Sequence, residues 1–304
     1  MNFDVVGVGA SCIDHVCRLP VFPEAGSARS KIRLISESRT CGGQTATALA
    51  SCQFFGLRTK YIGVVGEDED GARICHELRK RGIDTSDVAR RHGIPTATAT
   101  ILIDDTGDRI VLWHRDPALA FDPGRLPHEA LSSARLVHVD DVDEPAAIEA
   151  ARVARRAGVP VACDLDHITD QTGEFLTLVS IPIFAQHVPQ QLTGEADPER
   201  ALRALRRRHP GLLVVTMGAD GAAALDGGDF LRVPAFSVSA VDTTGAGDVF
   251  RGGLIYATLR GWPVVESLRF ANAAAAASCL TLGAMAGVPD LDAVRGILES
   301  ARRV

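Results

Sequence analysis

Short apolar runs of strand length alternate with longer segments that carry apolar residues at helical spacing through most of the chain. The runs are rich in β-branched residues and are bounded by turn residues, as buried parallel strands are. The predicted strands are Val5–Val8, Tyr61–Val65, Leu136–Val139, Val159–Cys163, Ile181–Phe184 and Leu212–Thr216. The predicted helices are Thr45–Phe55, Asp70–Arg81, Ala146–Ala157, Pro198–His209, Gly247–Arg260, Val264–Leu282 and Asp290–Arg303. This alternation predicts a layered α/β/α fold around a mainly parallel sheet.

Two early stretches differ, because polar and apolar residues alternate along them. They are Lys31–Ser38 and Thr96–Ile103, and the turn residues Asp104–Asp108 lead from the second into Arg109–Trp113. Alternation is typical of strands with one covered and one exposed face, and the turn predicts a hairpin. We therefore expect one domain over residues 1–304, with a small β lid inserted at about residues 12–40 and 95–115.

The composition excludes several classes of protein. Hydrophobic residues make up 46% of the 304 residues, which is enough for a large core, and the net charge of −6 offers no basic surplus for nucleic acid or an anionic membrane. No apolar run reaches the roughly 18 residues of a membrane span, and no secretory signal is visible. The seven cysteines form no zinc-ligand spacing. We expect a cytoplasmic protein without nucleic-acid or membrane partners.

Two stretches resemble known nucleotide-binding or catalytic motifs, but each lacks a residue that the motif requires. Gly7-Val8-Gly9 follows a predicted strand, but the third glycine of a dinucleotide-binding turn would fall at Cys12. His114-Arg115-Asp116 imitates a protein-kinase catalytic loop, yet Phe121 stands where that loop needs asparagine. Since no lysine follows a glycine anywhere in the chain, a P-loop is also excluded.

The stretch Ala240–Phe250 (AVDTTGAGDVF) carries the strongest chemical signal. The backbone N–H groups of Gly245, Ala246 and Gly247 can converge on an anion at the start of a helix, where the helix dipole also favours negative charge. Asp248 in the first turn could accept the proton of an attacking hydroxyl, as phosphoryl transfer requires. The four residues Gly245–Asp248 alone equally fit an acidic first turn that stabilises its helix by about 0.3–1 kcal/mol.

The whole stretch resembles the second signature of the PfkB (ribokinase-like) family of sugar and nucleoside kinases, DTxGAGD. The family fold is a layered α/β/α domain with a β lid, which agrees with the pattern above. The resemblance implies that Asp248 is the catalytic base and that Gly245, Ala246 and Gly247 form the anion hole.

The resemblance covers nearly the whole chain. Asp14 stands where the family has a substrate-binding aspartate, Gly42-Gly43 followed by Gln44 and Thr47 resembles the first signature GGxxxN, and Ile62–Gly71 resembles GxVGxDxxG. It implies three sets of site residues. The substrate set is Asp14, Gly42, Gly43, Gln44 and Thr47; the nucleotide set is Thr216, Gly218, Gly221 and Asn272; and the set for a monovalent cation such as K⁺ is Asp242, Thr244, Gly283 and Gly287.

Two departures from the family pattern bear on the substrate and the metal. Thr47 replaces the signature asparagine, and this GGxxxT variant resembles the branch that includes sulfofructose kinases, so an anionic ketose becomes a candidate substrate. Such a substrate needs a cation, for which the candidates are Arg29, Lys31, Arg33 and Arg115. The family's NxxE motif, which organises Mg²⁺, is replaced by Ala185 and Val188. The nucleotide phosphates would then be the main holders of Mg²⁺, with help from Asp164 or Asp166 after the preceding strand.

These observations predict an ATP- and Mg²⁺-dependent kinase that phosphorylates a primary hydroxyl of a small sugar, ketose or sugar acid. The resemblance also implies a homodimer formed through the lid. Two alternatives stay open: a nucleoside kinase, and a catalytically silent sugar or nucleotide sensor with the same fold, which the missing NxxE would suit.

Overall fold

The apolar runs form one eight-stranded sheet in the computed structural model, which describes residues 3–300. Its strands are β1 (Val5–Val8), β4 (Thr59–Ile62), β9 (Leu136–Asp140), β10 (Val161–Leu165), β11 (Ile181–Phe184), β12 (Leu213–Thr216), β13 (Ala222–Asp226) and β14 (Asp229–Val233). The order is β14-β13-β12-β11-β10-β9-β1-β4, and all neighbours from β4 to β12 are parallel. The hairpin of β13 and β14 adds an antiparallel edge. The predicted mainly parallel sheet is confirmed.

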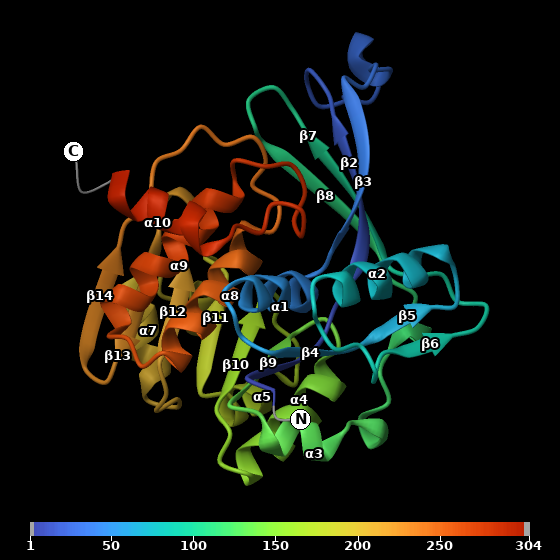
Figure 1. Ribbon diagram of the computed structural model, residues 1–304. Coiled ribbons are helices and arrows are strands. Elements are labelled where there is room, and N and C mark those ends of the chain that lie inside the picture. Colours follow the sequence, from blue (N-terminus) through green and yellow to red (C-terminus); the bar gives the residue numbers. More distant parts are fainter. Residues whose placement is uncertain (1–2, 301–304) are drawn as a thin grey trace.

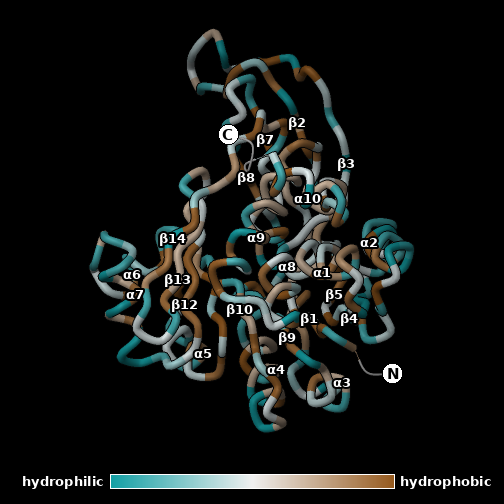
Figure 2. The backbone as a smooth tube through the Cα atoms, turned by 60° about the vertical axis from the view of Figure 1, so that its left-hand side comes forward, coloured by the Kyte–Doolittle hydropathy of each residue, from teal (hydrophilic) through white to brown (hydrophobic). Residues whose placement is uncertain are grey.

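Helices cover both faces of this large sheet (Figure 1). They are α1 (Gln44–Phe54), α2 (Glu69–Lys80), α3 (His128–Ser133), α4 (Glu144–Arg156), α5 (Thr172–Leu178), α6 (Val188–Thr193), α7 (Pro198–Arg206), α8 (Ala246–Leu259), α9 (Val264–Ser278) and α10 (Leu291–Ser300). On one face α1 packs on β1 and β4, and α8, α9 and α10 pack in sequence beside it; on the other face α4 packs on β1, β9 and β10, and α7 on β12 and β13. Each face has its own apolar core. Figure 2 shows the strands of the sheet as hydrophobic stretches between more hydrophilic outer segments.

Four strands form a second sheet, which we call the lid sheet. They are β2 (Cys12–Arg18), β3 (Ser36–Gly42), β7 (Thr98–Ile103) and β8 (Arg109–His114), in the order β3-β2-β7-β8. The predicted turn at Asp104–Asp108 connects β7 and β8, with Asp104 and Asp108 joined by a backbone hydrogen bond of 3.1 Å. In Figure 1 the lid sheet rises above the large sheet.

The two faces of the lid sheet are distinguished by register, because residues directly opposite each other on neighbouring strands share a face. Val16 on β2, with Ala99, Ile101 and Ile103 on β7, packs against Leu282 in the segment after α9. The face that carries these residues therefore looks toward the large-sheet part of the molecule, and we call it the inner face. The opposite face, which we call the outer face, carries the residues that alternate with these along the same strands.

Two predicted strands are wrong in their bounds. Residues 31–35 are not a strand: β3 begins at Ser36, opposite Arg18, where β2 ends. The Ile35 amide still donates to the Arg18 carbonyl at 2.8 Å, but β2 does not continue beside the residues before it. The predicted strand Tyr61–Val65 is interrupted at Gly63, where a Cβ would lie 2.2 Å from the Tyr61 hydroxyl. Beyond it, β5 (Val64–Gly66) leaves the large sheet and pairs with β6 (Ala89–Arg91).

Two predicted helices also differ at their C-terminal ends. α9 ends at Ser278 instead of Leu282, because Cys279 turns its carbonyl toward the amides of Val241 and Asp242. α10 ends at Ser300, and the last predicted positions, 301–303, lie outside the described residues. Within residues 3–300 no helix combines the length and apolar character needed to cross a membrane.

Candidate active site

The glycine-rich turn before α8 brings backbone donors to the start of a long helix. Gly245 caps α8 in the left-handed region, with φ of 77°, and a Cβ there would lie 2.7 Å from Ala284 Cβ, so the position requires glycine. Ala246 uses its N–H within the turn, donating to the Thr243 carbonyl at 3.2 Å. Of the three predicted donors, Gly245 and Gly247 are therefore the ones that the turn leaves for an anion.

Asp248 lies in the first turn of α8 beside a buried arginine. The Asp248 Oδ1 and Arg251 Nη1 atoms are 3.6 Å apart, and Arg251 also forms an ion pair with Asp164 at the end of β10. Burial raises the pKa of Asp248 to about 7, while the Arg251 guanidinium favours its ionised form. A carboxylate that titrates near neutral pH is suited to general-base chemistry.

The Arg251 guanidinium also lies against the glycine turn. A Cβ built on Gly247 would be 2.5 Å from Arg251 Nη1, so the glycine leaves the space that this cation occupies. The side chain of Arg251 is 6% exposed. A fixed positive charge thus lies beneath the predicted anion hole and next to the predicted base.

The predicted substrate residues gather where β2, β3 and α1 meet. Asp14 is 3% exposed and accepts a hydrogen bond from Cys12 Sγ at 3.2 Å, and burial raises its pKa to about 6. A Cβ on Gly42 would lie 2.0 Å from Asp14 Oδ2, so the backbone approaches this carboxylate closely. Gly43 adopts φ of 101° and packs against Ser11, where a Cβ would clash. Both glycines of the first signature are thus required by the local geometry.

Asp140 holds this end of α1 in place. Its Oδ2 accepts hydrogen bonds from the Ala10 amide at 2.7 Å and from Thr45 Oγ1 at 2.7 Å. Because Asp140 is the last residue of β9, it links the ends of two neighbouring strands to the first turn of α1. The sequence analysis did not single it out.

Buried polar atoms without a hydrogen-bond partner surround Asp14 and the glycine pair. A buried polar atom left unpaired costs about 1–3 kcal/mol, so a hydroxyl-rich ligand that satisfies several would gain binding energy. Within the described part of the chain these atoms are Ser11 Oγ, Thr40 Oγ1, Gln44 Oε1 and Thr47 Oγ1. Thr47 itself is fully buried on α1.

The predicted nucleotide residues lie on β12, the turn after it, and α9. Thr216 ends β12 and donates from Oγ1 to the Phe184 carbonyl at 3.3 Å. Gly218 and Gly221 adopt φ of 56° and 91° in the following turn, and a Cβ on Gly221 would lie 2.2 Å from the Val233 carbonyl. Asn272 uses its amide group to anchor the end of β14, donating to the carbonyls of Val233 and Pro234 at 3.0 and 3.1 Å. Direct contact of Asn272 with a nucleotide stays a prediction.

Asp242 joins the two segments of the predicted cation site. Its carboxylate accepts from the Thr244 amide and from the Gly283 amide, each at 2.8 Å, and the Gly287 amide donates to the Gly283 carbonyl at 2.7 Å. Among residues 3–300, Thr244 Oγ1 is buried without a hydrogen-bond partner. The four predicted residues are therefore together, and Asp242 already has a structural role in holding both segments.

Two of the four predicted cations for an anionic substrate already take part in ion pairs. Arg115 donates to the Leu119 carbonyl at 2.7 Å and pairs with Asp143 at 3.1 Å, so it is committed to this packing. Arg29 pairs with Glu24 on the surface, whereas Lys31 and Arg33 make no ion pair within residues 3–300.

Arg109, which the sequence analysis missed as a site residue, connects the lid sheet to the glycine-rich turn. Its Nη1 donates to Thr243 Oγ1 at 3.1 Å, and its charge favours the ionised form of Asp248. The contact places the first residue of β8 at the segment that leads into α8. No sequence pattern marks it, because its position depends on the hairpin register.

Arg251 was also missed, and its pairing with Asp164, which the sequence analysis named only as a helper for Mg²⁺, did leave a signal in the sequence. Arg251 lies in the otherwise apolar run after Asp248, and Asp164 lies in the buried strand β10. A charge inside an apolar run must be paired, and the two pair with each other.

The structure offers no ready metal cluster. Within residues 3–300 no group of three or more His, Cys, Asp or Glu side chains is arranged to hold a metal ion. At the positions of the family NxxE motif, Val188 is fully buried and Ala185 is half-buried, and neither has an oxygen side chain to offer. That the nucleotide phosphates would be the main holders of Mg²⁺ stays a prediction.

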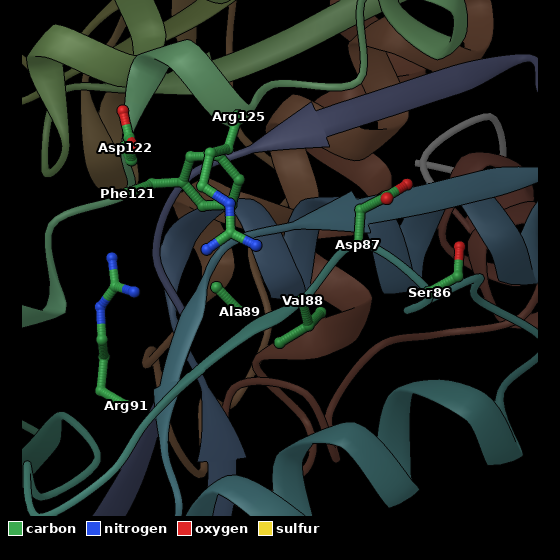
Figure 3. A pocket seen from close by; sticks show the side chains of 8 residues that line it. All are labelled: Ser86, Asp87, Val88, Ala89, Arg91, Phe121, Asp122 and Arg125. Atoms are coloured by element: carbon green, nitrogen blue, oxygen red, sulfur yellow. The ribbon is translucent and has the colours of Figure 1, made fainter.

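A small hollow of about 170 Å³ lies away from these residues (Figure 3). It is formed by the segment around β6 and the chain before α3, and its wall mixes two arginines with two aspartates. None of the predicted site residues lines it. The lining residues are Ser86, Asp87, Val88, Ala89, Arg91, Phe121, Asp122 and Arg125.

Comparison with known proteins gives the family. The model of the pfkB family of carbohydrate kinases matches residues 4–291. An ATP-dependent ribose-1-phosphate kinase from Halopiger xanaduensis is 30% identical, with 97% of this chain and 98% of that protein covered. A nucleoside kinase from Methanothermobacter thermautotrophicus is 27% identical, with 94% and 93% covered.

Solved structures share the fold over the whole chain. A crystal structure from Agrobacterium tumefaciens has a TM-score of 0.89 at 28% identity, covering 100% of this chain and 98% of that one. The ribokinase from Thermotoga maritima has a TM-score of 0.82 at 22% identity, with 98% and 99% covered. The expected fold, a layered α/β sheet with a small separate sheet, is confirmed.

Proposed function

This chain belongs to the pfkB family of carbohydrate kinases, and on that premise we propose that it transfers a phosphoryl group from ATP to a primary hydroxyl of a small sugar, ketose or sugar acid. The observation that carries the proposal is the position of Asp248. Its carboxylate lies in the first turn of α8, directly after the glycine turn, and the charge of Asp14 acts on it. In this proposal Asp248 is the base, the glycine turn is the anion site, and Asp14 binds the hydroxyls of the acceptor.

Each of these residues has a defined task in the proposed reaction. Asp14 accepts hydrogen bonds from hydroxyls of the acceptor, and Asp248 accepts the proton of the attacking hydroxyl. The amides of Gly245 and Gly247 donate to the charge that develops on the phosphoryl oxygens, and the start of α8 adds its dipole. Mg²⁺, where it accompanies ATP, supplies charge neutralisation between the phosphates.

A coupled ADP-release assay tests the proposal. The panel contains ketoses, aldoses, sugar acids, nucleosides and an anionic ketose. The last is included because Thr47 replaces asparagine, and because Lys31 and Arg33 make no ion pair within the described residues. We expect ADP formation that depends on one class of acceptor. A rise in melting temperature with a sugar, without turnover by any member of the panel, would instead favour the sensor.

The reaction is expected to depend on pH with an acid limb near neutrality. Asp248 works as a base only when ionised, and burial raises its pKa to about 7, so kcat/KM should rise as the pH increases through about 7 and level off above it. Steady-state kinetics over a pH series measures this, with circular dichroism to show that the fold is intact at each pH. A profile that stays flat through this range contradicts the assignment of Asp248.

We also propose that the chain forms a homodimer through the outer face of the lid sheet. Ile110 and Leu112 lie on that face of β8, opposite Leu102 and Thr100, and are 41% and 58% exposed. Apolar side chains at a free sheet edge favour association with another chain.

Replacing Leu112 by lysine is expected to shift the protein from dimer to monomer, because a charge would be buried in the contact. Size-exclusion chromatography with light scattering measures the mass. Val265→Lys is the control, since Val265 is 47% exposed at the start of α9, away from the lid sheet. A wild-type protein that is already monomeric refutes the proposal.

A monovalent cation such as K⁺ completes the proposal. The support is that Asp242 accepts hydrogen bonds from the amides of Thr244 and Gly283, which brings Asp242, Thr244, Gly283 and Gly287 together. Within residues 3–300 the Thr244 hydroxyl is buried without a hydrogen-bond partner. Hydroxyl and carbonyl oxygens are suitable ligands for such an ion.

A further inference from the structure

The motif at Ile62–Gly71 has no task in the reaction proposed above. It runs from the end of β4 through β5 into the first turn of α2. Its aspartate, Asp68, caps α2 by accepting a hydrogen bond from the Gly71 amide at 2.7 Å. The same carboxylate also has a partner outside the helix, which a cap alone does not need.

That partner is Thr96, two residues before β7 begins. The Asp68 carboxylate accepts hydrogen bonds from the Thr96 amide at 2.8 Å and from the Thr96 hydroxyl at 2.6 Å. The hydroxyl in turn accepts from the Gly66 amide at 2.9 Å. Thr96 is 5% exposed, and a Cβ on Gly66 would lie 2.7 Å from the Thr96 nitrogen. The motif therefore encloses Thr96 and needs its glycine to do so.

Thr96 leads directly into the strand pair that carries Asp14. The carbonyl of the next residue, Ala97, accepts a hydrogen bond from the Ile13 amide at 3.0 Å. Asp14 follows Ile13 on β2 and lies opposite Ala99 on β7. A continuous series of hydrogen bonds thus joins the motif to the backbone beside the carboxylate that binds the acceptor.

The first two turns of α2 also hold the other neighbour of β2, which lies between β3 and β7. Arg39 on β3 forms an ion pair with Asp70, and its carbonyl accepts a hydrogen bond from Arg73 Nη2 at 2.9 Å. The next residue of β3, Thr40, lies opposite Asp14. In Figure 1 α2 lies below the lid sheet. Both strands beside Asp14 are therefore tied to α2.

The two ties differ in strength. The Arg39 side chain is 43% exposed, and ion pairs at the surface contribute little. Burial acts to raise the pKa of Asp68, but the hydrogen bonds from Thr96 and Gly71 outweigh it and hold that pKa below its usual value. Hydrogen bonds to an ionised acceptor are roughly twice as strong as neutral ones. The contact between Asp68 and Thr96 is therefore the main tie.

We propose that Asp68 and Thr96 are positioning residues for Asp14, because they fix the start of β7 and, through it, the carboxylate that binds the acceptor. The inference rests on the proposed function and gives the motif a task in it. Hydrogen bonds to the acceptor depend on where this carboxylate lies. The predicted nucleotide residues lie on β12, the turn after it and α9, so the tie acts on the affinity for the acceptor and not on that for ATP.

Kinetics of Thr96→Val tests this role. Valine has the shape of threonine but lacks the hydroxyl that joins Gly66 to Asp68. We expect the acceptor KM to rise roughly tenfold, which corresponds to about 1.4 kcal/mol, with the KM for ATP unchanged. Asp68→Ser should have the same effect, since serine still caps α2 but has a single oxygen. Thr96→Ser keeps the hydroxyl and should keep the KM of the wild type.

Thr59→Val is the matched control. Thr59 is 2% exposed on β4, and its amide and hydroxyl both donate to Gln53 Oε1, at 3.2 and 2.9 Å. This variant therefore removes a comparable buried hydroxyl from the large sheet and should leave the acceptor KM unchanged. An acceptor KM that stays the same in Thr96→Val and Asp68→Ser, or that rises equally in Thr59→Val, overturns the inference.

Hydrogen exchange gives a second readout that needs no turnover. Asp68→Asn keeps the cap and the shape of the side chain but not its charge, so it decides the inference even if Thr96→Val does not fold. The Ile13 amide should exchange several-fold faster in Asp68→Asn than in the wild type, whereas Thr59→Val should leave its exchange unchanged. Unchanged exchange of the Ile13 amide in Asp68→Asn overturns the inference. Faster exchange, but no ADP formation with any acceptor, would refute the proposed function and leave the positioning of Asp14 standing.

Discussion

Asp248→Asn is expected to lower kcat by roughly 10²- to 10⁴-fold, the contribution typical of a positioned general base. Asparagine has the same shape as aspartate but cannot accept the proton of the attacking hydroxyl. The amides of Gly245 and Gly247 are untouched, so ATP binding should change by no more than a few-fold. ADP release at saturating substrate measures kcat, and calorimetric titration measures nucleotide binding. Near-normal turnover in this variant would refute the assigned role.

The same variant separates a catalytic role from a structural one. Burial raises the folded-state pKa of Asp248 from 3.8 to about 7. A carboxyl group shifted upward in this way destabilises the folded protein as the pH rises from about 4 to about 7, because the unfolded state releases its proton first. At pH 8 the neutral asparagine should therefore keep or raise the melting temperature. A loss of activity together with a clear fall in melting temperature would point to misfolding instead.

Much of the fold could be predicted from the sequence because buried strands and helices carry continuous or periodic runs of apolar residues. The strands β1, β9 and β11 are buried on both faces, and their continuous apolar runs are visible in the sequence. The hairpin of β13 and β14 was missed because Ala222–Leu225 is rich in alanine, which favours helix. It is a strand because it pairs with β12, and this pairing is a tertiary effect.

The candidate site could be predicted only in part, for a related reason. The glycines and Asp248 are adjacent in sequence, so the resemblance of the whole stretch Ala240–Phe250 to DTxGAGD identifies them together, although Gly245–Asp248 alone equally fit an acidic first turn. Asp164 and Arg251, by contrast, meet only because the end of β10 and the first turns of α8 lie together in the fold. The sequence shows that each needs a partner but not which one it finds.

Register sets a further limit on what the sequence predicts. Alternation in Thr96–Ile103 indicates two faces, but which face looks inward depends on the packing of Ile101 against Leu282. A shift of one residue would exchange the two faces. The assignment of Ala99 to the inner face and Leu112 to the outer face therefore needed the structure.

The second large effect is expected at Arg251. Arg251→Met should lower the free energy of unfolding by about 3–5 kcal/mol, because Asp164, which is fully buried, would lose its ion-pair partner. Chemical denaturation measures this. The double variant Arg251→Met with Asp164→Asn should recover most of the loss, since neither partner is then charged. Arg251→Lys, which keeps the charge but not the forked geometry, should lie between the wild type and Arg251→Met.

Arg251 should also control the pH profile, which a purely structural residue would not. Its guanidinium favours ionised Asp248, so without it the Asp248 pKa rises and the acid limb of kcat/KM moves to higher pH. In the double variant the Asp164 carboxylate, whose charge interacts with Asp248, is lost together with the guanidinium, so the limb should return part of the way toward lower pH. In Arg251→Met the other charged groups that act on Asp248 stay in place and do not account for the displacement; in the described part of the chain they include Asp14, Arg109 and Asp166. If kcat/KM rises at the same pH in both variants as in the wild type, Arg251 stabilises the site but does not set the pKa of Asp248.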